Sequence, residues 1–570
     1  MINLQAPIRM TNSEIVEKLD EAVSYMELLE MNVFKINTFR NLSQQVEKTT
    51  TPLRLNSEEE ILQGFTKTMA KVILTLLQTG SYPEFDELEK QIPAGVRAML
   101  QINGIGPKKV GTLWKDAGIT TLEELKKACL LSQVSQIKGF GGKIQEIILL
   151  GIAFVESVQG KLLMHHGEAL AEKLESDWKS ANVSGFIRVG DLVTKNEVVS
   201  VLEFLFPVSG RSELNSWLAS NPDFEIQKEK SGPFHTMAWY FPKSAQCGFF
   251  FASADEFPKQ HYVLNTADAH WQAARQAGIP LYSVWKKGEF ESDEALFQKL
   301  DKPYVSPEIR TGNFEWNEGF TDRNDSLIKE SDLKGCIHNH STYSDGKNSI
   351  EEMAQWCIEH GLQYFGIADH SKAAQYASGL HEEKVEAQWV EIDKLNIKLA
   401  PFRILKGIES DILGDGSLDY GEEILKGFDY VVASVHSVLK MDKETATNRL
   451  LKAIENPYTH VLGHCSGRIL LKRPGYPLDY TKIIDACVAN QVAIEINAHP
   501  SRLDMDWQNL ARALDKGAII SINPDAHERE GMAMMKYGVW LARKAGASAS
   551  QVLNAMDLSS ILRFFKKSNK

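Results

Sequence analysis

The chain has 570 residues, of which 43% are hydrophobic and 24% charged. This composition excludes a disordered, fibrous or collagen-like chain, and the length predicts several domains, because single cores stop growing at roughly 250–300 residues. The net charge of −12 excludes a uniformly basic nucleic-acid coat. No apolar run approaches the roughly 20 residues of a membrane span, and no export leader is readable. The six scattered cysteines contain no CxxC pair. We therefore expect a monomeric, cytoplasmic protein that has no membrane segment.

The first third of the sequence predicts helices. Apolar side chains recur at helical spacing over residues 14–30, and further helices are expected over 67–77, 84–90 and 94–101. Residues 97–143 hold eight Lys or Arg against three acids, a local charge of +5. A basic stretch in an acidic chain predicts a surface that contacts phosphates.

Two glycine-rich turns lie in this basic stretch, one at residues 103–109 and a weaker copy at 138–143. Glycines between two helices let the backbone N–H groups that open the second helix face a phosphate. Either turn alone could be an ordinary turn between packed helices, but two copies predict helix-hairpin-helix motifs that bind DNA independently of its sequence. The residues expected to contact DNA are Gly104, Gly106, Lys108, Lys109, Gly139, Gly141 and Lys143.

The middle of the chain, residues 162–309, mixes helices with alternating strands. The clearest expected strands are 198–206 and 247–252. Residues 311–325 are rich in Asn, Asp and Gly and predict a linker to a different kind of sequence.

From residue 333 onwards, short apolar runs alternate with amphipathic helices. The expected strands are 335–340, 364–368, 403–408, 429–435, 460–463, 492–497 and 518–523. The expected helices are 349–360, which begins with the capping box Ser349/Glu352, and 444–455, 480–490 and 507–516. This alternation implies a parallel sheet, most simply closed as a barrel.

Titratable residues follow the ends of these strands. In a β/α barrel the carboxyl ends of the strands meet on one face, so residues far apart in the sequence share one pocket. Strand alternation would place His338 and His340 on one face of the first strand. Any one of these histidines alone is more simply a satisfied strand-end residue, but the whole pattern predicts a metal site. The candidate ligands are His338, His340, Asp345, His370, Glu409, His436, His464, Asp525 and His527.

Nitrogen and oxygen ligands without thiolate suit Zn²⁺ or Mn²⁺, with Fe²⁺ as a further candidate, and nine of them predict two or three ions. Clustered metals clamp the attacking and leaving oxygens of a phosphoryl displacement and generate hydroxide near neutral pH. Arg468 and Arg502 are expected to hold the phosphate oxygens. The catalytic set expected is thus Glu409, Arg468 and Arg502.

The C-terminal motifs resemble the polymerase-and-histidinol-phosphatase (PHP) domain over residues 333–570. They are residues 338–346, 368–371, 407–409, 434–437, 463–464 and 525–527. The resemblance implies a distorted (β/α)₇ barrel with a trinuclear metal centre and fills all nine ligand positions. It also implies that one metal is held by His338, His340, Glu409 and Asp525, a second by Glu409, His436 and His464, and a third by Asp345, His370 and His527.

The order of features along the whole chain is similar to bacterial family X DNA polymerases, which also end in a PHP domain. Residues 34–40, 78–80 and 104–109 carry this resemblance in the first third. It implies a lyase-like helical domain (1–80), a fingers-like helix-hairpin-helix region (81–158), an α+β palm (159–254), a thumb-like region (255–315), a linker (316–332) and the PHP domain (333–570).

The palm departs from the family pattern. Residues 185–189 stand at the family's Gly-Ser-x-Arg-Arg turn. Val201 and Glu203 stand at the two positions of its Asp-x-Asp strand, and Gly248 at its third aspartate. The turn of the nucleotide pocket becomes residues 265–267. We therefore expect a degenerate palm without nucleotidyl transfer.

The sequence thus favours a metal-dependent 3′–5′ exonuclease of DNA repair on a polymerase-like scaffold. One alternative is an active family X polymerase that also has an exonuclease and fills repair gaps. Asp191 is then the best remaining candidate for a catalytic carboxylate of the palm. The others are a DNA-binding scaffold without turnover and a small-molecule phosphatase of the histidinol-phosphate type.

Overall fold

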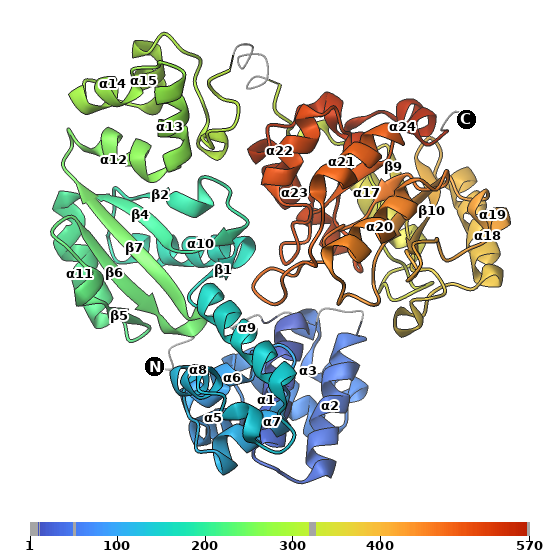
Figure 1. The fold of residues 1–570 in the computed structure, drawn as a ribbon, viewed down its shortest axis with the longest axis horizontal. Coiled ribbons are helices and arrows are strands. Elements are labelled where there is room, and N and C mark those ends of the chain that lie inside the picture. Colours follow the sequence, from blue (N-terminus) through green and yellow to red (C-terminus); the bar gives the residue numbers. More distant parts are fainter. Residues whose placement is uncertain (1–9, 11, 50–52, 318–325, 567–570) are drawn as a thin grey trace. The chain divides into compact units, whose positions relative to one another are not determined.

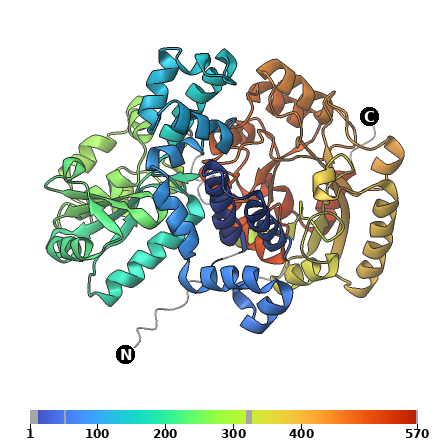
Figure 2. The same cartoon turned by 90° about the horizontal axis from the view of Figure 1, so that it is seen from below.

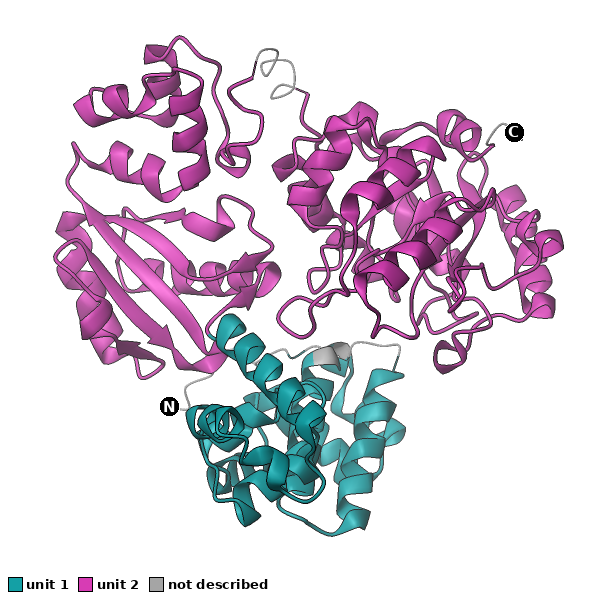
Figure 3. Ribbon diagram, in the orientation of Figure 1, with its two compact units in different colours: residues 1–159 teal, residues 160–570 magenta. Residues whose placement is uncertain are grey.

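The computed structural model describes residues 10, 12–49, 53–317 and 326–566. The chain divides into two compact units, residues 1–159 (unit 1) and 160–570 (unit 2), shown in Figure 3. Part of the expected linkers 311–325 and 316–332, namely residues 318–325, lies outside the described residues.

Unit 1 is built of helices, drawn in blue to teal in Figure 2. Their core gathers the apolar faces of these helices, with Leu19, Ile73, Val96 and Ile148 fully buried. Gly80 ends α4 with a positive φ of 75°, and its N–H bonds the carbonyl of Leu76. The helices are α1 (Asn12–Leu28), α2 (Val33–Glu47), α3 (Glu58–Gly64), α4 (Lys67–Thr79), α5 (Pro83–Gln91), α6 (Ala94–Met99), α7 (Pro107–Gly111), α8 (Leu122–Leu130) and α9 (Gly142–Val158).

Unit 2 begins with a mixed five-stranded sheet in the order β2-β4-β7-β6-β5. Trp178 of α10 packs against its Phe204, Phe206 and Phe249, and Trp217 of α11 packs against Trp178. Helices α12–α15 follow (Figure 1, yellow-green). The elements are α10 (Met164–Ser180), β2 (Ile187–Val189), β4 (Leu202–Pro207), α11 (Arg211–Ser220), β5 (Phe224–Ile226), β6 (His235–Tyr240), β7 (Ala245–Ala252), α12 (Phe257–Leu264), α13 (Asp268–Gln276), α14 (Leu281–Lys287) and α15 (Asp293–Lys299).

The expected single strand 198–206 is wrong, because the chain forms two strands here. β3 (Val198–Val199) pairs with β1 (Leu162–Leu163), whereas β4 pairs with β2 and β7. At the break, the Ser200 N–H donates to Asp191 Oδ2 at 2.6 Å. A side chain therefore takes the hydrogen bond that a continuous ladder would use.

The second half of unit 2 is a seven-stranded parallel barrel whose strands pair in chain order. An isolated parallel bridge from Asn339 to Ala526 joins the chain after the first strand to the chain after the seventh, so the barrel is nearly closed. The strands are β8 (Gly335–Cys336), β9 (Tyr364–Ile367), β10 (Arg403–Asp411), β11 (Tyr430–Ser434), β12 (Val461–Leu462), β13 (Ala493–Asn497) and β14 (Ile520–Asn523).

Helices connect the barrel strands (Figure 1, yellow to red). The capping box of α17 is present, with Ser349 and Glu352 bonding each other's backbone N–H groups. The helices are α17 (Ile350–Glu359), α18 (Glu382–Lys398), α19 (Glu422–Leu425), α20 (Lys443–Ile454), α21 (Tyr480–Ala489), α22 (Trp507–Asp515), α23 (Met535–Lys544) and α24 (Leu558–Phe565). The expected fold class, helices followed by an α/β middle and a (β/α)₇ barrel, is confirmed.

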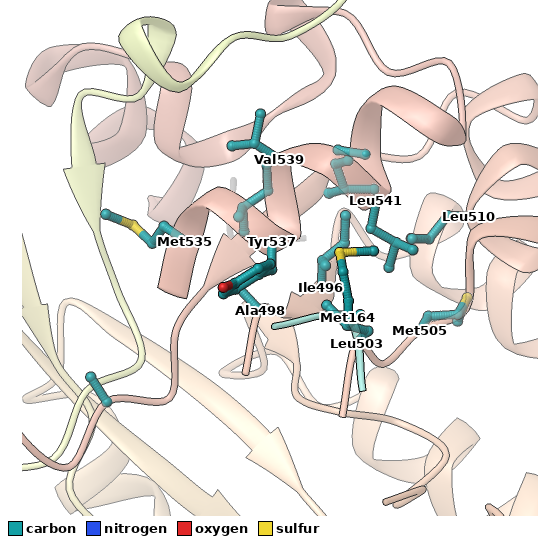
Figure 4. Close-up of a cluster of buried hydrophobic side chains, with 14 of the residues drawn as sticks. Met164, Ile496, Ala498, Leu503, Met505, Leu510, Met535, Tyr537, Val539 and Leu541 are labelled. Carbon is teal, nitrogen blue, oxygen red and sulfur yellow. The ribbon is translucent and has the colours of Figure 1, made fainter. Parts of the chain in front are cut away.

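Within unit 2 the mixed sheet region and the barrel share one core. Figure 4 shows Met164, the first residue of α10, among barrel residues that include Ile496 and Leu503. A polar contact adds to it: the carboxylate of Glu197 pairs with Arg468 at 3.0 Å. The loop before β3 is thereby fixed to the barrel.

All six cysteines are buried and free. In the part of the chain that the structure describes, no helix has both the length and the apolar content that a membrane crossing needs.

Candidate metal centre

The carboxylate of Glu409 lies at the centre of a buried cluster of imidazoles. Its Oε1 is 3.2 Å from His338 Nε2, 3.1 Å from His436 Nε2 and 3.0 Å from His464 Nε2. Its Oε2 is 2.9 Å from His370 Nδ1 and 3.7 Å from His340 Nε2. Five strand-end histidines that are far apart in the sequence thus surround one carboxylate.

The remaining candidates complete the cluster. Asp525 Oδ1 is 2.9 Å from His340 Nε2, and Asp345 Oδ2 is 3.4 Å from His527 Nε2 and 3.7 Å from His370 Nε2. Four overlapping groups have ligand atoms within 4.8 Å of one another. Among the described residues these groups contain the nine expected ligands and no others. They are His340/Asp345/His370/His527, His338/His464/Asp525, His338/His340/Glu409 and His370/Glu409/His436.

The grouping differs in part from the expected sharing of three metals. Asp345, His370 and His527 fall together as expected, with His340 added. His464 falls with His338 and Asp525 as well as beside Glu409. The assignment of ligands to individual ions stays a prediction.

The expected reason for the placement of His338 and His340 is wrong. Strand β8 ends at Cys336, and His338 has a positive φ of 63°. A turn, rather than the pleat of a strand, therefore points both imidazoles at Glu409. Asp525 also has a positive φ, 51°. Non-glycine residues in this region are uncommon and gather at functional sites.

Carboxylates behind the cluster orient two imidazoles, and the sequence did not lead us to them. Glu495 Oε1 lies 2.5 Å from His338 Nδ1 and accepts a hydrogen bond from Asn523 Nδ2, while Glu495 Oε2 accepts from the His464 N–H. Asp411 Oδ1 lies 3.0 Å from His436 Nδ1. Such partners fix the tautomer, so that Nε2 faces the centre. The available signal was a single acid in the apolar run 492–497.

The electrostatics of the cluster suit a divalent cation. Burial alone would raise the pKa of Glu409, but His436, His338 and His370 hold it well below its usual range. Burial, together with His527 and His370, lowers the pKa of His340 to about 3. Burial opposes protonation of His436, yet Glu409 and Asp411 raise its pKa to about 10. Carboxylates are thus ionised and His340 is neutral, as ligands must be, and binding of a cation would release protons from other histidines.

Several buried atoms of the cluster make no hydrogen bond among the described residues, although they lie close to one another. They are His338 Nε2, His340 Nδ1, His370 Nδ1 and Glu409 Oε2. Buried polar atoms are normally satisfied, so unpartnered ones require an explanation. A divalent cation would satisfy these atoms, and the donor set therefore fits a metal centre.

The two expected phosphate-binding arginines have different surroundings. Arg502 Nε lies 3.9 Å from Asp525 Oδ2, beside the cluster. Arg468 donates instead to the carbonyls of Arg502 and Leu503 and pairs with Glu197. These contacts engage part of its guanidinium, and its expected role in holding phosphate oxygens stays a prediction.

The three expected palm positions lie together. In the parallel pair of β4 and β7, Glu203 stands opposite Gly248, and a Cβ at Gly248 would lie 3.3 Å from Val201 Cγ1. Burial, and then Asp191, raises the pKa of Glu203 to about 7. Both Asp191 oxygens accept hydrogen bonds at 2.6 Å, one from Asn196 Nδ2 and one from the Ser200 N–H. The Asp191 carboxylate therefore stabilises the loop in which it lies.

The two glycine turns of unit 1 share one backbone conformation. Gly104 and Gly139 have φ values of 98° and 88°. Two residues later, Gly106 and Gly141 are the N-caps of α7 and α9, with φ/ψ of −99°/177° and −101°/175°. A Cβ at Gly106, Gly139 or Gly141 would meet nothing within 4 Å, so the surface is open to a close ligand. Such repeated geometry suits two equivalent phosphate contacts.

Comparisons with known proteins agree with this architecture. Family models match the PHP domain at residues 337–499, a helix-hairpin-helix domain at 10–82 and a SAM-like helix-hairpin-helix tandem at 96–152. The tandem covers both predicted turns, whereas the match at 10–82 was not predicted.

The "DNA polymerase/3'-5' exonuclease PolX" of Bacillus subtilis (strain 168) is 32% identical, over 98% of this chain and 100% of that protein. A probable phosphatase of Thermoanaerobacter sp. (strain X514) is 30% identical over 41% of this chain and 94% of its own length.

Proposed function

The chain belongs to the bacterial family X DNA polymerases that carry a PHP domain, and we propose that it is a metal-dependent 3′–5′ exonuclease of DNA repair whose palm does not add nucleotides. The observation that carries this proposal is the convergence of nine nitrogen and oxygen ligands, with Glu409 at their centre. The proposed domain plan is the one expected above, with boundaries at 80, 158, 254, 315 and 332.

The nine residues would hold two or three divalent ions, Mn²⁺ or Zn²⁺ or also Fe²⁺, and bound ions would supply Lewis-acid activation and a hydroxide nucleophile. Glu409 would bridge ions, and Glu495 and Asp411 would orient His338 and His436. Arg502, beside Asp525, would hold non-bridging oxygens of the phosphodiester. The nine ligands and Arg502 would thereby form one charged centre beside the phosphodiester bond that is cut.

Three features support the loss of nucleotidyl transfer. Val201 and Gly248 offer no carboxylate, and Glu203 is half-buried with a raised pKa. Asp191 is engaged in its own loop. In the turn that replaces the nucleotide pocket, Asn265 Oδ1 accepts the Gly190 N–H at 2.9 Å, so this turn makes an internal contact.

An active polymerase is the second candidate, because the Bacillus relative is named as a DNA polymerase as well as an exonuclease. A phosphatase is supported by the names of two relatives, probable phosphatases that match 41% and 28% of this chain. The two helix-hairpin-helix matches favour a DNA substrate over a small phosphate ester.

Incubation with a 5′-labelled primer–template and Mn²⁺ tests the proposal. We expect a ladder of shortened labelled products, whether or not nucleotides are present, because only the barrel is active. Extension with nucleotides would instead identify a polymerase, and an unchanged primer would contradict the exonuclease. Histidinol phosphate, offered in parallel, tests the phosphatase alternative.

DNA binding should depend on the lysines of the first glycine turn. Replacing Lys108 and Lys109 by Glu should weaken binding to all sequences about equally, because these side chains would contact phosphates. The slope of log affinity against log salt should become less steep by about 0.9 for each duplex phosphate that the variant no longer neutralises. Fluorescence anisotropy in EDTA measures this without digestion.

The matched control replaces Lys115 and Lys126 by Glu, a charge change of the same size in the same basic stretch. Those lysines already pair with Glu30 and Glu156, so the decrease in affinity should be smaller. A sequence preference that disappears with Lys108 and Lys109 would contradict the phosphate-clamp interpretation.

A further inference from the structure

An exposed aromatic side chain stands beside the metal centre. Tyr376 lies in the short turn Gln375–Ala377, six residues after His370, and its ring centroid is 6.2 Å from that of His370. It is 74% exposed. Among the described residues of the barrel, 333–566, it is the one exposed Phe, Tyr or Trp. Folding gains little from an exposed ring, so its place needs another explanation.

The turn that carries Tyr376 is held firmly to the metal centre. Ala374 and Ala377, on either side of the tyrosine, are buried. The Ala374 N–H bonds Ser371 O at 3.0 Å, and the Leu380 N–H bonds His370 O at 2.8 Å, so both ends of the loop attach next to His370.

A second contact fixes the outer side of the loop, because the Ala373 N–H donates to Asp419 Oδ2 at 2.6 Å. Gly379 approaches so closely that a Cβ there would lie 2.0 Å from Ser371 O. The ring of Tyr376 is therefore presented from a preorganised backbone, which lowers the entropic cost of binding a ligand against it.

The ligand that fits a flat, exposed ring beside a phosphodiesterase centre is a nucleobase. An aromatic ring stacks on any base, with a gain of roughly 1–3 kcal/mol per base, and so imposes no sequence preference. The histidines and carboxylates of the centre face one another, whereas Tyr376 presents an exposed flat ring on which a base can stack.

We propose that Tyr376 is the platform on which the base of the 3′-terminal nucleotide stacks while its phosphodiester lies at the metal centre. The inference rests on the proposed exonuclease function and deepens it, because it names the residue that would bind the base of the nucleotide to be removed.

The test compares two 5′-labelled single strands that differ only at the 3′-terminal residue, which carries a base in one and is a reduced abasic residue in the other. We expect the protein, with Mn²⁺, to remove the base-bearing residue faster. Tyr376→Ala should lower kcat/KM on that end by about 5- to 150-fold, and on the abasic end by no more than about twofold. Tyr376→Phe should behave as the unchanged protein, because stacking needs the ring and not the hydroxyl.

Ile397→Ala is the matched control. Ile397 is 82% exposed at the end of α18, which leads into the opposite end of the barrel strands, so its replacement should change neither rate. An equal slowing of both ends by Tyr376→Ala would overturn the inference, since the residue would then act on the centre or the fold. Unchanged rates on both ends would overturn it as well. If the unaltered protein digests neither strand, the proposed exonuclease function itself fails, a result separate from any effect of Tyr376.

Discussion

Replacing Glu409 by Gln should remove bound metal and nuclease activity together. The carboxylate contacts five imidazoles and is fully buried. The amide keeps the shape of the side chain but loses the negative charge that balances the cations. Removing an outer partner of a metal ligand alone typically costs about 10–100-fold in affinity or activity, so removing this central carboxylate should cost more. Elemental analysis and the 5′-labelled strand assay measure the two effects.

Two further variants should lose metal and activity to different extents, which can be compared with the loss in Glu409→Gln. Glu495→Gln alters only the partner of His338 and should lower metal affinity or activity by about 10–100-fold. His340→Ala removes a direct ligand and should resemble Glu409→Gln. Fewer than one equivalent of metal in the unaltered protein, purified without chelator and resupplied with Mn²⁺ or Zn²⁺, would contradict the metal centre. Undiminished nuclease in His340→Ala would contradict the role of this cluster.

The barrel could be predicted from the sequence because its strands are buried on both sides. A buried strand appears as a mainly apolar run, and runs such as Tyr364–Ile367 and Tyr430–Ser434 are fully buried. Polar residues directly after such runs must lie on one rim of a β/α barrel, which is why the nine ligands could be named together.

What the sequence did not reveal depends on contacts between distant segments. Glu495 supports His338 across 157 positions, and Arg468 is engaged by Glu197 from a different part of unit 2. Neither contact leaves a local pattern. The left-handed backbone of His338 likewise replaces the expected strand geometry while giving the same side-chain direction.

The middle of the chain was harder to predict for the same reason. The residues from Val198 to Phe206 have the composition of one strand. The Ser200 N–H, however, donates to the Asp191 side chain, and the segment forms two strands. Periodicity records which side chains are apolar and cannot record which backbone group a remote carboxylate will bind.

Primer extension should be undetectable in a His340→Ala variant, which removes the competing nuclease. Two-metal phosphoryl transfer needs carboxylates that hold both ions near the attacking 3′ oxygen. Val201 cannot coordinate a cation, and Gly248 has no side chain. Glu203 remains, but a carboxyl whose pKa is raised to about 7 by burial is only partly ionised near neutral pH. The assay uses a template-annealed primer, all four nucleotides and Mg²⁺ or Mn²⁺.

The size of this effect follows from how such sites work. Catalysis of phosphoryl transfer is mostly positioning and electrostatic stabilisation, and a misplacement of about 1 Å can already cost about 10²-fold. Two of the three metal-holding positions lack a carboxylate. The resulting loss in the rate of extension should therefore be larger than tight DNA binding could offset. Asp191 could substitute only by releasing Asn196 and the Ser200 N–H, which would leave the loop before β4 without its two short hydrogen bonds. An unaltered DNA affinity in the His340→Ala variant, measured by anisotropy, shows that absent extension is not absent binding. Template-dependent extension by this variant would mean that the palm still holds catalytic ions, and the degenerate-palm proposal would be wrong.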